Sequence, residues 1–235
     1  MIGYNSEDDL EELKEEGRRR ADALRSRYEE SGNIMGWFEA CYDQADGEAA
    51  LIPWGHEIAR PEFVEWLENL PQHRRRGRAL DTGCGLGDNA ARLADAGFKV
   101  TAFDLSETAI RWAAKRFPDM QIVWRVADLV NPPEDFFEAF DLVNETYTLQ
   151  ALRPPFREAA IKSLARFVKP GGTLLIVGRG RHADEPENPP PWPLVRPELD
   201  CLLEAGLTLV GFDDFHTERK GRPVRHFRIE YKRNK

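Results

Sequence analysis

The segment 79–88, which reads Ala-Leu-Asp-Thr-Gly-Cys-Gly-Leu-Gly-Asp, constrains the fold more than any other part of the chain. An apolar strand end leads into a Gly-x-Gly-x-Gly turn, and a helix-forming segment at 89–96 follows at once. Glycines in such a turn let a nucleotide-like ligand lie against the backbone, where a Cβ would clash. A second strand, 99–104, ends in Asp104, and a carboxylate there suits the two hydroxyls of a ribose. These two segments together predict a nucleoside-cofactor site.

Composition limits the class of protein. The 235 residues, 41% hydrophobic and 31% charged, predict one domain of ordinary size or a domain with an added helical arm. The net charge of −8 weighs against a large nucleic-acid interface. Cys41, Cys84 and Cys201 form no C-x-x-C pair, so neither a metal site nor a disulfide framework is expected. Without a signal-peptide-like start or an 18-residue apolar run, the chain is expected to be cytoplasmic, with no membrane contact.

Strands and helices alternate from residue 78 onward. The predicted strands are 78–82, 99–104, 121–126, 140–145 and 172–178, and the helices between them are 88–96, 107–117 and 155–168. This alternation is typical of an α/β fold, a doubly wound parallel sheet with helices on both faces.

The chain is expected to end in an antiparallel pair. After a helix at 197–205, strand-like runs at 207–216 and 224–232 are joined by a turn too short for a crossover. The prediction is therefore a seven-stranded, mostly parallel sheet whose last strand is antiparallel.

The N-terminal part is predicted to be a helical cover. An amphipathic helix is expected at 6–30 and a second helix at 62–70. We therefore divide the chain into an N-terminal arm or lid, 1–70, and a nucleotide-binding domain, 71–235.

From residue 78 to the end, the chain resembles the class I S-adenosylmethionine (SAM)-dependent methyltransferases. The resemblance rests on motifs in the family's order, at 80–87 (LDTGCGLG), 103–106 (FDLS), 127–129 (ADL), 140–143 (FDLV) and 168–174 (VKPGGTL). The G-x-G-x-G spacing and the reversed last strand fit an NAD-dependent oxidoreductase less well, because its turn reads G-x-G-x-x-G. The resemblance implies SAM as cofactor and S-adenosylhomocysteine as product.

The resemblance also assigns contacts to the cofactor. The glycine loop would hold the methionine part, Asp104 the ribose and Asp128 the adenine amino group, with a leucine on each side of the ring. The expected cofactor-binding residues are Asp81, Gly83, Cys84, Gly85, Gly87, Asp104, Leu105, Asp128, Leu129 and Glu145, together with Trp37 and Trp54 from the arm.

The arm resembles, in character rather than by motif, the aromatic-rich segment that covers the cofactor in thiopurine and thiol S-methyltransferases. Trp37, Tyr42 and Trp54 are the candidates for this cover, with Tyr42 also facing the acceptor. The alternative is that they are ordinary core aromatics.

The catalytic candidates follow the fourth strand, where residues 144–147 read Asn-Glu-Thr-Tyr. The family's motif for methylation of adenine or amide nitrogen is missing there. Glu145 is a candidate base or binds a cationic acceptor, although it also suits the capping of a turn. Tyr147 and His56 are the other catalytic candidates, and Gln150 is expected near the transfer site.

The acceptor pocket should border the loop at 178–186 and the proline-rich run at 189–193, beyond the carboxyl ends of the strands. Arg179 and Arg181 are expected to hold an anionic group, and Trp192 to form a wall. The alternative is a solvent-facing linker. The expected substrate residues are Tyr42, Tyr147, Gln150, Arg179, Arg181 and Trp192.

These features predict an enzyme, a monomer or homodimer, that methylates a small molecule, with a thiol as first choice of acceptor and a hydroxyl second. A thiolate acceptor needs no protein base, whereas a hydroxyl gains from one, here His56 or Glu145. The alternatives are a non-catalytic SAM-binding protein and an NAD-dependent oxidoreductase.

Overall fold

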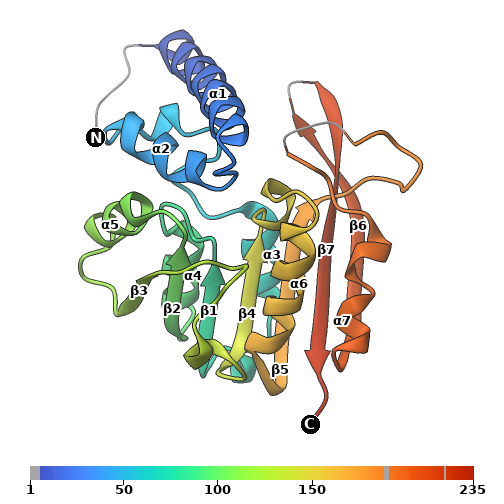
Figure 1. Ribbon diagram of the computed structural model, residues 1–235. Helices are drawn as coiled ribbons and strands as arrows, with labels where there is room; N and C mark the ends of the chain where they lie inside the picture. Colours follow the sequence, from blue (N-terminus) through green and yellow to red (C-terminus); the bar gives the residue numbers. More distant parts are fainter. Residues whose placement is uncertain (1–5, 188–190, 220) are drawn as a thin grey trace.

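The computed structural model describes residues 6–187, 191–219 and 221–235, so two prolines of the run 189–193 lie outside the described residues. A seven-stranded sheet in the order β3-β2-β1-β4-β5-β7-β6 forms the centre of the molecule (Figure 1). Its strands are β1 (Arg78–Thr82), β2 (Lys99–Asp104), β3 (Ile122–Val126), β4 (Phe140–Thr146), β5 (Val168–Arg179), β6 (Leu207–Arg219) and β7 (Arg222–Arg233).

The strand directions confirm the predicted topology. Neighbours from β3 through β5 pair in parallel, whereas β7 is antiparallel to both β5 and β6. The strand order reverses between β1 and β4, so the loops that follow these two strands diverge. In open α/β sheets, ligands bind at such a switch point, outside the carboxyl ends of the strands.

Helices cover both faces of the sheet. On one face, α3 (Pro61–Asn69) and α4 (Asp88–Asp95) share a buried apolar cluster with β1, β2 and β5. On the other face, α6 (Phe156–Phe167) and α7 (Cys201–Glu204) pack on the central strands and β7. Helix α5 (Glu107–Arg116) lies against β2 and β3.

Strand β7 shows how the pattern of the sequence becomes packing. Phe227, Ile229 and Tyr231 are at most 2% exposed and join the cluster of α6 and α7. The opposite side faces α3, where the Trp66 Nε1–H donates to Glu230 at 3.0 Å. Both sides of this strand are therefore covered.

The expected helix at 197–205 is shorter and irregular. A 3₁₀ turn at Arg196–Leu199 precedes the single turn of α7. Glu198 fixes the first turn, because its carboxylate accepts from the Val195 N–H at 3.1 Å and pairs with buried Arg157 at 2.9 Å. Gly206, at φ 84°, ends the segment where β6 must begin.

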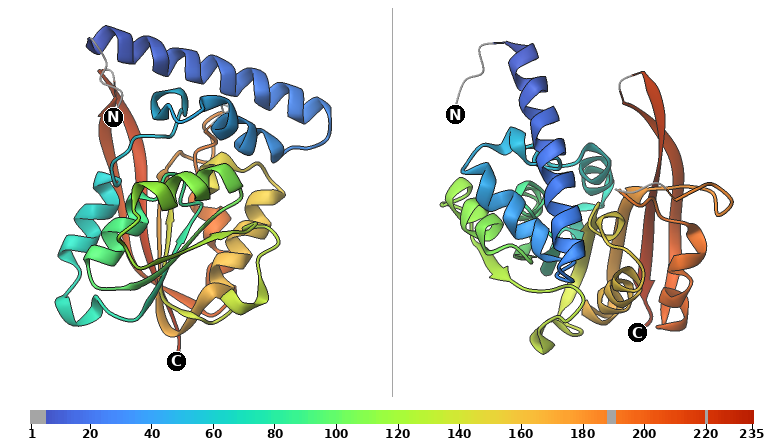
Figure 2. Two further views of the ribbon diagram at one scale, coloured as in Figure 1. Left: turned by 90° about the vertical axis from the view of Figure 1, so that its left-hand side faces the viewer. Right: turned by 45° about the horizontal axis from the view of Figure 1, so that its top comes forward.

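Two helices, α1 (Glu7–Glu30) and α2 (Gly36–Ala45), lie beyond the carboxyl ends of the strands, and the β6–β7 hairpin extends past the other strands on the same side (Figures 1 and 2). The division of the chain at residue 70 stays a prediction. In the described part of the chain, no helix is both long and apolar enough to cross a membrane.

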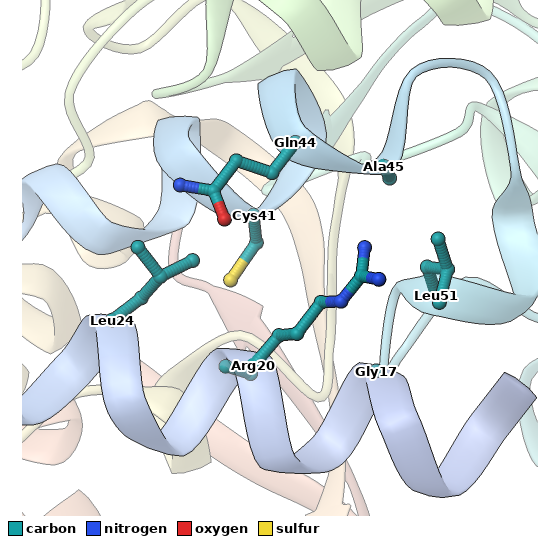
Figure 3. A pocket seen from close by; sticks show the side chains of 8 residues that line it. Gly17, Arg20, Leu24, Cys41, Gln44, Ala45 and Leu51 are labelled. Carbon is teal, nitrogen blue, oxygen red and sulfur yellow. The ribbon is translucent and has the colours of Figure 1, made fainter.

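Gly17 lets α1 approach the turn at Ala49–Leu51 closely. A Cβ at Gly17 would lie 2.5 Å from the Leu51 carbonyl oxygen. The same contact region, lined by Arg20, Leu24 and Cys41 among others, is shown in Figure 3. The glycine therefore serves backbone-to-backbone packing in the middle of a helix, where it is otherwise unfavourable.

We predict that Gly17→Ala lowers the Tm. Helix propensity alone would favour alanine by about 1 kcal/mol, but overpacking against backbone costs about 1–3 kcal/mol. The exposed Ser26→Ala, on the same helix, is the control and should leave the Tm unchanged or raise it. Thermal melts followed by circular dichroism give both values. A Tm of Gly17→Ala above that of the unmodified protein would contradict the packing account.

Candidate cofactor and acceptor site

The glycine loop follows β1 and is closely packed by its neighbours. Gly83, Gly85 and Gly87 all have positive φ, at 60°, 53° and 88°. A Cβ on Gly83 would collide with the Thr148 side chain, and one on Gly87 would lie 2.6 Å from Trp124. At Gly85 only the Tyr42 hydroxyl lies within 4 Å of the Cβ position. Gly85 is buried, and of the three glycines it has the fewest atoms near its Cβ position.

Asp104 joins the end of β2 to this loop. Its carboxylate accepts the Gly85 N–H at 2.9 Å and the Ser106 N–H at 3.0 Å. The Cys84 N–H donates to the Phe103 carbonyl at 2.9 Å, which fixes the loop from a second point. Burial raises the pKa of Asp104. The expected ribose acceptor is thus next to the loop that it positions.

The expected adenine-binding residues follow β2 and β3. The Asp128 Oδ1 accepts the Val130 N–H at 2.8 Å, and the Asp128 carboxylate is half-buried. Leu105 is also half-buried, whereas Leu129 is 6% exposed and belongs to the core cluster of α6.

Two buried carboxylates lie at the ends of β1 and β4. The Asp81 Oδ1 accepts from the Asn144 side chain at 2.7 Å, and the Glu145 Oε1 accepts the N–H groups of Thr148 and Leu149. The other oxygen of each carboxylate has no hydrogen-bond partner among the described residues. Burial raises the pKa of both groups to about 7.

These orphaned oxygens fit SAM. A buried carboxylate oxygen without a partner is costly and is satisfied by a cation or a donor. SAM carries an ammonium and a sulfonium group, so it offers the matching charge. The Glu145 oxygen that is already bound caps the turn after β4, as the alternative interpretation of the sequence expected.

The aromatic residues of the arm come together over the loop. Trp37 packs on Trp54 at 5.5 Å between ring centroids, and the Trp54 Nε1–H donates to the Tyr42 hydroxyl at 2.7 Å. All three belong to or pack on a cluster that includes Leu86. Tyr42 therefore lies at the glycine loop, on the cofactor side of the site.

Glu39 of α2 is a functional candidate that the sequence did not indicate. Its carboxylate accepts from the Ser106 and Thr108 hydroxyls, both at 2.5 Å, and from the Thr108 N–H at 3.2 Å. These groups form the beginning of α5, so Glu39 fastens the arm to the core. The residues next to Glu39 in the sequence give no indication of partners so distant in the chain.

Tyr147, an expected substrate residue, directly follows β4. Its φ is 65°, in the left-handed region. The Arg60 Cζ lies 5.0 Å from the ring centroid, and the His226 ring lies 5.8 Å away. Arg179 is opposite His226 in the β5–β7 register. Sequence reasoning missed Arg60 and His226, since one precedes a helix and the other was assigned to the polar side of a strand.

The structure does not bring three other expected substrate residues to Tyr147. The Arg181 guanidinium donates to the Glu185 carbonyl at 2.8 Å, within its own loop. The Gln150 side chain accepts the Arg179 N–H at 2.7 Å, and its carbonyl accepts the Trp192 N–H. Trp192 is 7% exposed. Their observed contacts build the loop beside the site.

His56 is partly exposed and lies near three cationic side chains. Partial burial and the charges of Arg60, Arg219 and Lys14 lower its pKa to about 4. The imidazole is therefore neutral at pH 7.

Comparisons with known proteins identify the family. A family model described as a methyltransferase domain matches residues 79–172. Thiocyanate methyltransferase 1 of Brassica oleracea is 30% identical over 186 residues, which are 76% of each chain. The 2-heptyl-1-hydroxyquinolin-4(1H)-one methyltransferase of Mycobacteroides abscessus is 27% identical over 173 residues, 71% of this chain and 74% of that protein.

The fold has close structural counterparts. The 1,6-didemethyltoxoflavin-N1-methyltransferase of Burkholderia thailandensis, solved with S-adenosylhomocysteine, superposes with a TM-score of 0.63 at 20% identity, over 84% of this chain and 88% of that one. With the Brassica relative and the methyltransferase domain match, the family is established: this chain belongs to the class I SAM-dependent methyltransferases, of the thiol methyltransferase type.

Proposed function

We propose that this enzyme transfers the methyl group of SAM to the sulfur of a small thiol and releases S-adenosylhomocysteine. The observation that carries the proposal is the character of the acceptor side, where Tyr147 meets the Arg60 guanidinium. Two carboxylates are near this surface. Glu145 is fully buried and bound to two backbone N–H groups, and Glu62 is next to Arg60 and Tyr147. With the Arg60 charge beside Tyr147, we infer that the surface suits an acceptor that reacts as an anion.

The cofactor side has a distinct set of proposed roles. Asp104 binds the ribose hydroxyls, Asp128 accepts from the adenine amino group, and the Gly85 backbone supports the methionine part. The aromatic residues of the arm exclude water above them. When bound, SAM supplies an electrophilic methyl group on a positively charged sulfur.

The arginines beside Tyr147 prepare the acceptor. A cation close to a thiol lowers the thiol pKa, so that the thiolate, the reactive form, predominates near neutral pH. The thiol proton leaves to solvent before transfer. As the bond from the acceptor sulfur to the methyl carbon forms, the bond from that carbon to the cofactor sulfur breaks. Residues that hold the acceptor sulfur, the methyl carbon and the cofactor sulfur in line lower the activation barrier by positioning the reactants. This effect is worth up to about 7–11 kcal/mol.

A hydroxyl acceptor is the second candidate. The name of the Mycobacteroides relative describes a hydroxyquinolone methyltransferase, although His56, with its pKa lowered to about 4, would be a weak base for a hydroxyl. The relation to a thiocyanate methyltransferase favours sulfur. The cytoplasmic location and the state as monomer or homodimer stay predictions.

We predict that thiols are methylated faster than matched hydroxyl compounds. Thiophenol and phenol differ in one atom, and the thiol ionises far more readily at pH 7. The kcat/KM, measured by S-adenosylhomocysteine release, should be at least about tenfold higher for thiophenol, which corresponds to about 1.4 kcal/mol in the barrier. Equal or faster turnover of phenol would overturn the sulfur assignment and favour the hydroxyl candidate.

We predict that Asp104→Asn weakens SAM binding by about 10- to 100-fold, the range for a lost hydrogen bond to a charged group. An asparagine has one oxygen and cannot accept from both Gly85 and Ser106 while it binds a ribose. Isothermal titration calorimetry measures the affinity, with Asp135→Asn on the surface as control. Unchanged affinity of Asp104→Asn would show that the ribose lies elsewhere.

We also predict that SAM binds more tightly as the pH rises from 6 to 8. With pKa values of about 7, Asp81 and Glu145 are partly protonated in the free enzyme, and a cationic ligand favours their ionised forms. Below pH 7 the affinity should fall by up to about tenfold per pH unit for one coupled carboxyl. Asp81→Asn should flatten this dependence in calorimetric titrations, and Asp135→Asn should retain it. A pH-independent affinity of the unmodified enzyme contradicts the assignment.

The stability of the free enzyme should change with pH in the opposite direction to its affinity for SAM. A carboxyl whose pKa is raised by folding stabilises the free protein at low pH and loses this contribution as the pH rises from about 4 through 7. Deprotonation of Asp81 and Glu145 should therefore lower the Tm of the free enzyme over this window. Bound SAM should offset this decrease.

A further inference from the structure

We propose that the acceptor carries a fixed anionic group, a carboxylate or similar oxyanion, and that Arg60, Arg179 and Arg219 bind this group beside Tyr147. We call these three residues the arginine cluster. The inference rests on the proposed function and deepens it, because it names the class of thiol: an organic anion rather than a neutral compound.

The cluster is assembled from three separate elements. Arg60 directly precedes α3, Arg179 ends β5, and Arg219 ends β6 at the tip of the hairpin that extends past the other strands (Figure 2). Arg60 lies over the Tyr147 ring, and Arg179 is paired in register with His226, whose ring contacts Tyr147. Burial is the main cause that lowers the pKa of Arg179, and the charges of Arg219 and Arg60 lower it further.

The cluster lacks the anionic partners that neighbouring arginines have. Within the described residues, no carboxylate forms an ion pair with Arg60, Arg179 or Arg219, and the Arg60 guanidinium donates only to the Trp54 carbonyl, at 3.3 Å. By contrast, Arg225 and Arg228 of β7 are paired with Asp214 and Asp213 across the hairpin.

Nearby groups leave the cluster with an excess of positive charge. Glu62 faces Arg60 and Tyr147, and Asp88, whose charge also reaches Arg60, is bound by Arg116 at 2.8 Å. The pKa values of His56 and His226 are both lowered, chiefly by burial, so these rings add no charge at pH 7. The charges of three guanidinium groups and one carboxylate, Glu62, thus act on this part of the site, and a single thiolate does not cancel the difference.

The surroundings indicate the shape of the anion. Arg60 and Arg179 are half-buried, and half-buried cations without a counter-ion are unfavourable. Guanidinium groups match carboxylates through paired, charge-assisted hydrogen bonds. Tyr147, His226 and Phe215 provide adjacent flat surfaces, since the Phe215 and His226 rings are stacked at 5.7 Å. An aromatic thiol with a carboxylate fits both features.

The test compares 4-mercaptobenzoate with 4-mercaptobenzamide, which has the same shape and no carboxylate charge. We expect the unmodified enzyme to favour the benzoate by about 10- to 100-fold in kcat/KM, the range for a hydrogen bond to a charged group. In Arg179→Gln this ratio should fall to near one, and in the exposed Arg219→Gln it should fall by a smaller factor. Arg92→Gln, a surface arginine paired with Glu68, should retain the full ratio.

Binding separates this inference from the proposed function. In calorimetric titrations with S-adenosylhomocysteine present, 4-mercaptobenzoate should bind the unmodified enzyme at least about tenfold more tightly than Arg179→Gln. A ratio near one in the unmodified enzyme, with both thiols methylated, would overturn the anion site and leave sulfur methylation intact. Tight, Arg179-dependent binding without any methylation would support the anion site and overturn the sulfur assignment.

Discussion

The hydrogen bond from the Gly85 N–H to the Asp104 carboxylate is the interaction on which the rest of the site depends. It ties a loop of positive-φ glycines to the end of the neighbouring strand. The same carboxylate accepts the Ser106 N–H, and Ser106 in turn caps α5 and binds Glu39 of the arm. One side chain thereby aligns the loop, the beginning of a helix and the cover above both. Burial of this carboxylate is tolerated because its oxygens are hydrogen-bonded.

The charges of the site are divided between its two sides. Asp81 and Glu145 are buried and Asp104 is half-buried, at the ends of three adjacent strands, on the side where we propose that the cationic cofactor binds. The arginine cluster lies on the other side of Tyr147, where we propose that an anionic acceptor binds. Reactants of opposite charge are thus drawn to opposite sides, and their charges cancel as the methyl group moves. A site that excludes water strengthens this arrangement.

The fold and the identity of the cofactor could be predicted from the sequence because their signals are local. Each signal lies in the same short segment as the structure that it predicts. The signals are the periodicity of the strands, the spacing of the glycines and the carboxylates at the strand ends. The acceptor side could not be predicted in the same way. In the sequence, His226 belongs to the polar side of a strand. Helix α3 covers that side in the structure, and His226 is only 5% exposed. Arg179 and Arg181 are near neighbours of the same type, yet Arg181 is bound within its own loop.

A crystal structure of the enzyme with S-adenosylhomocysteine tests the central claim most directly. The account predicts ribose hydroxyls within hydrogen-bond distance of the Asp104 carboxylate, the amino acid part along the Gly85 backbone, and the sulfur directed toward Tyr147. A ribose away from Asp104, or a sulfur directed away from Tyr147 and the arginine cluster, would contradict it.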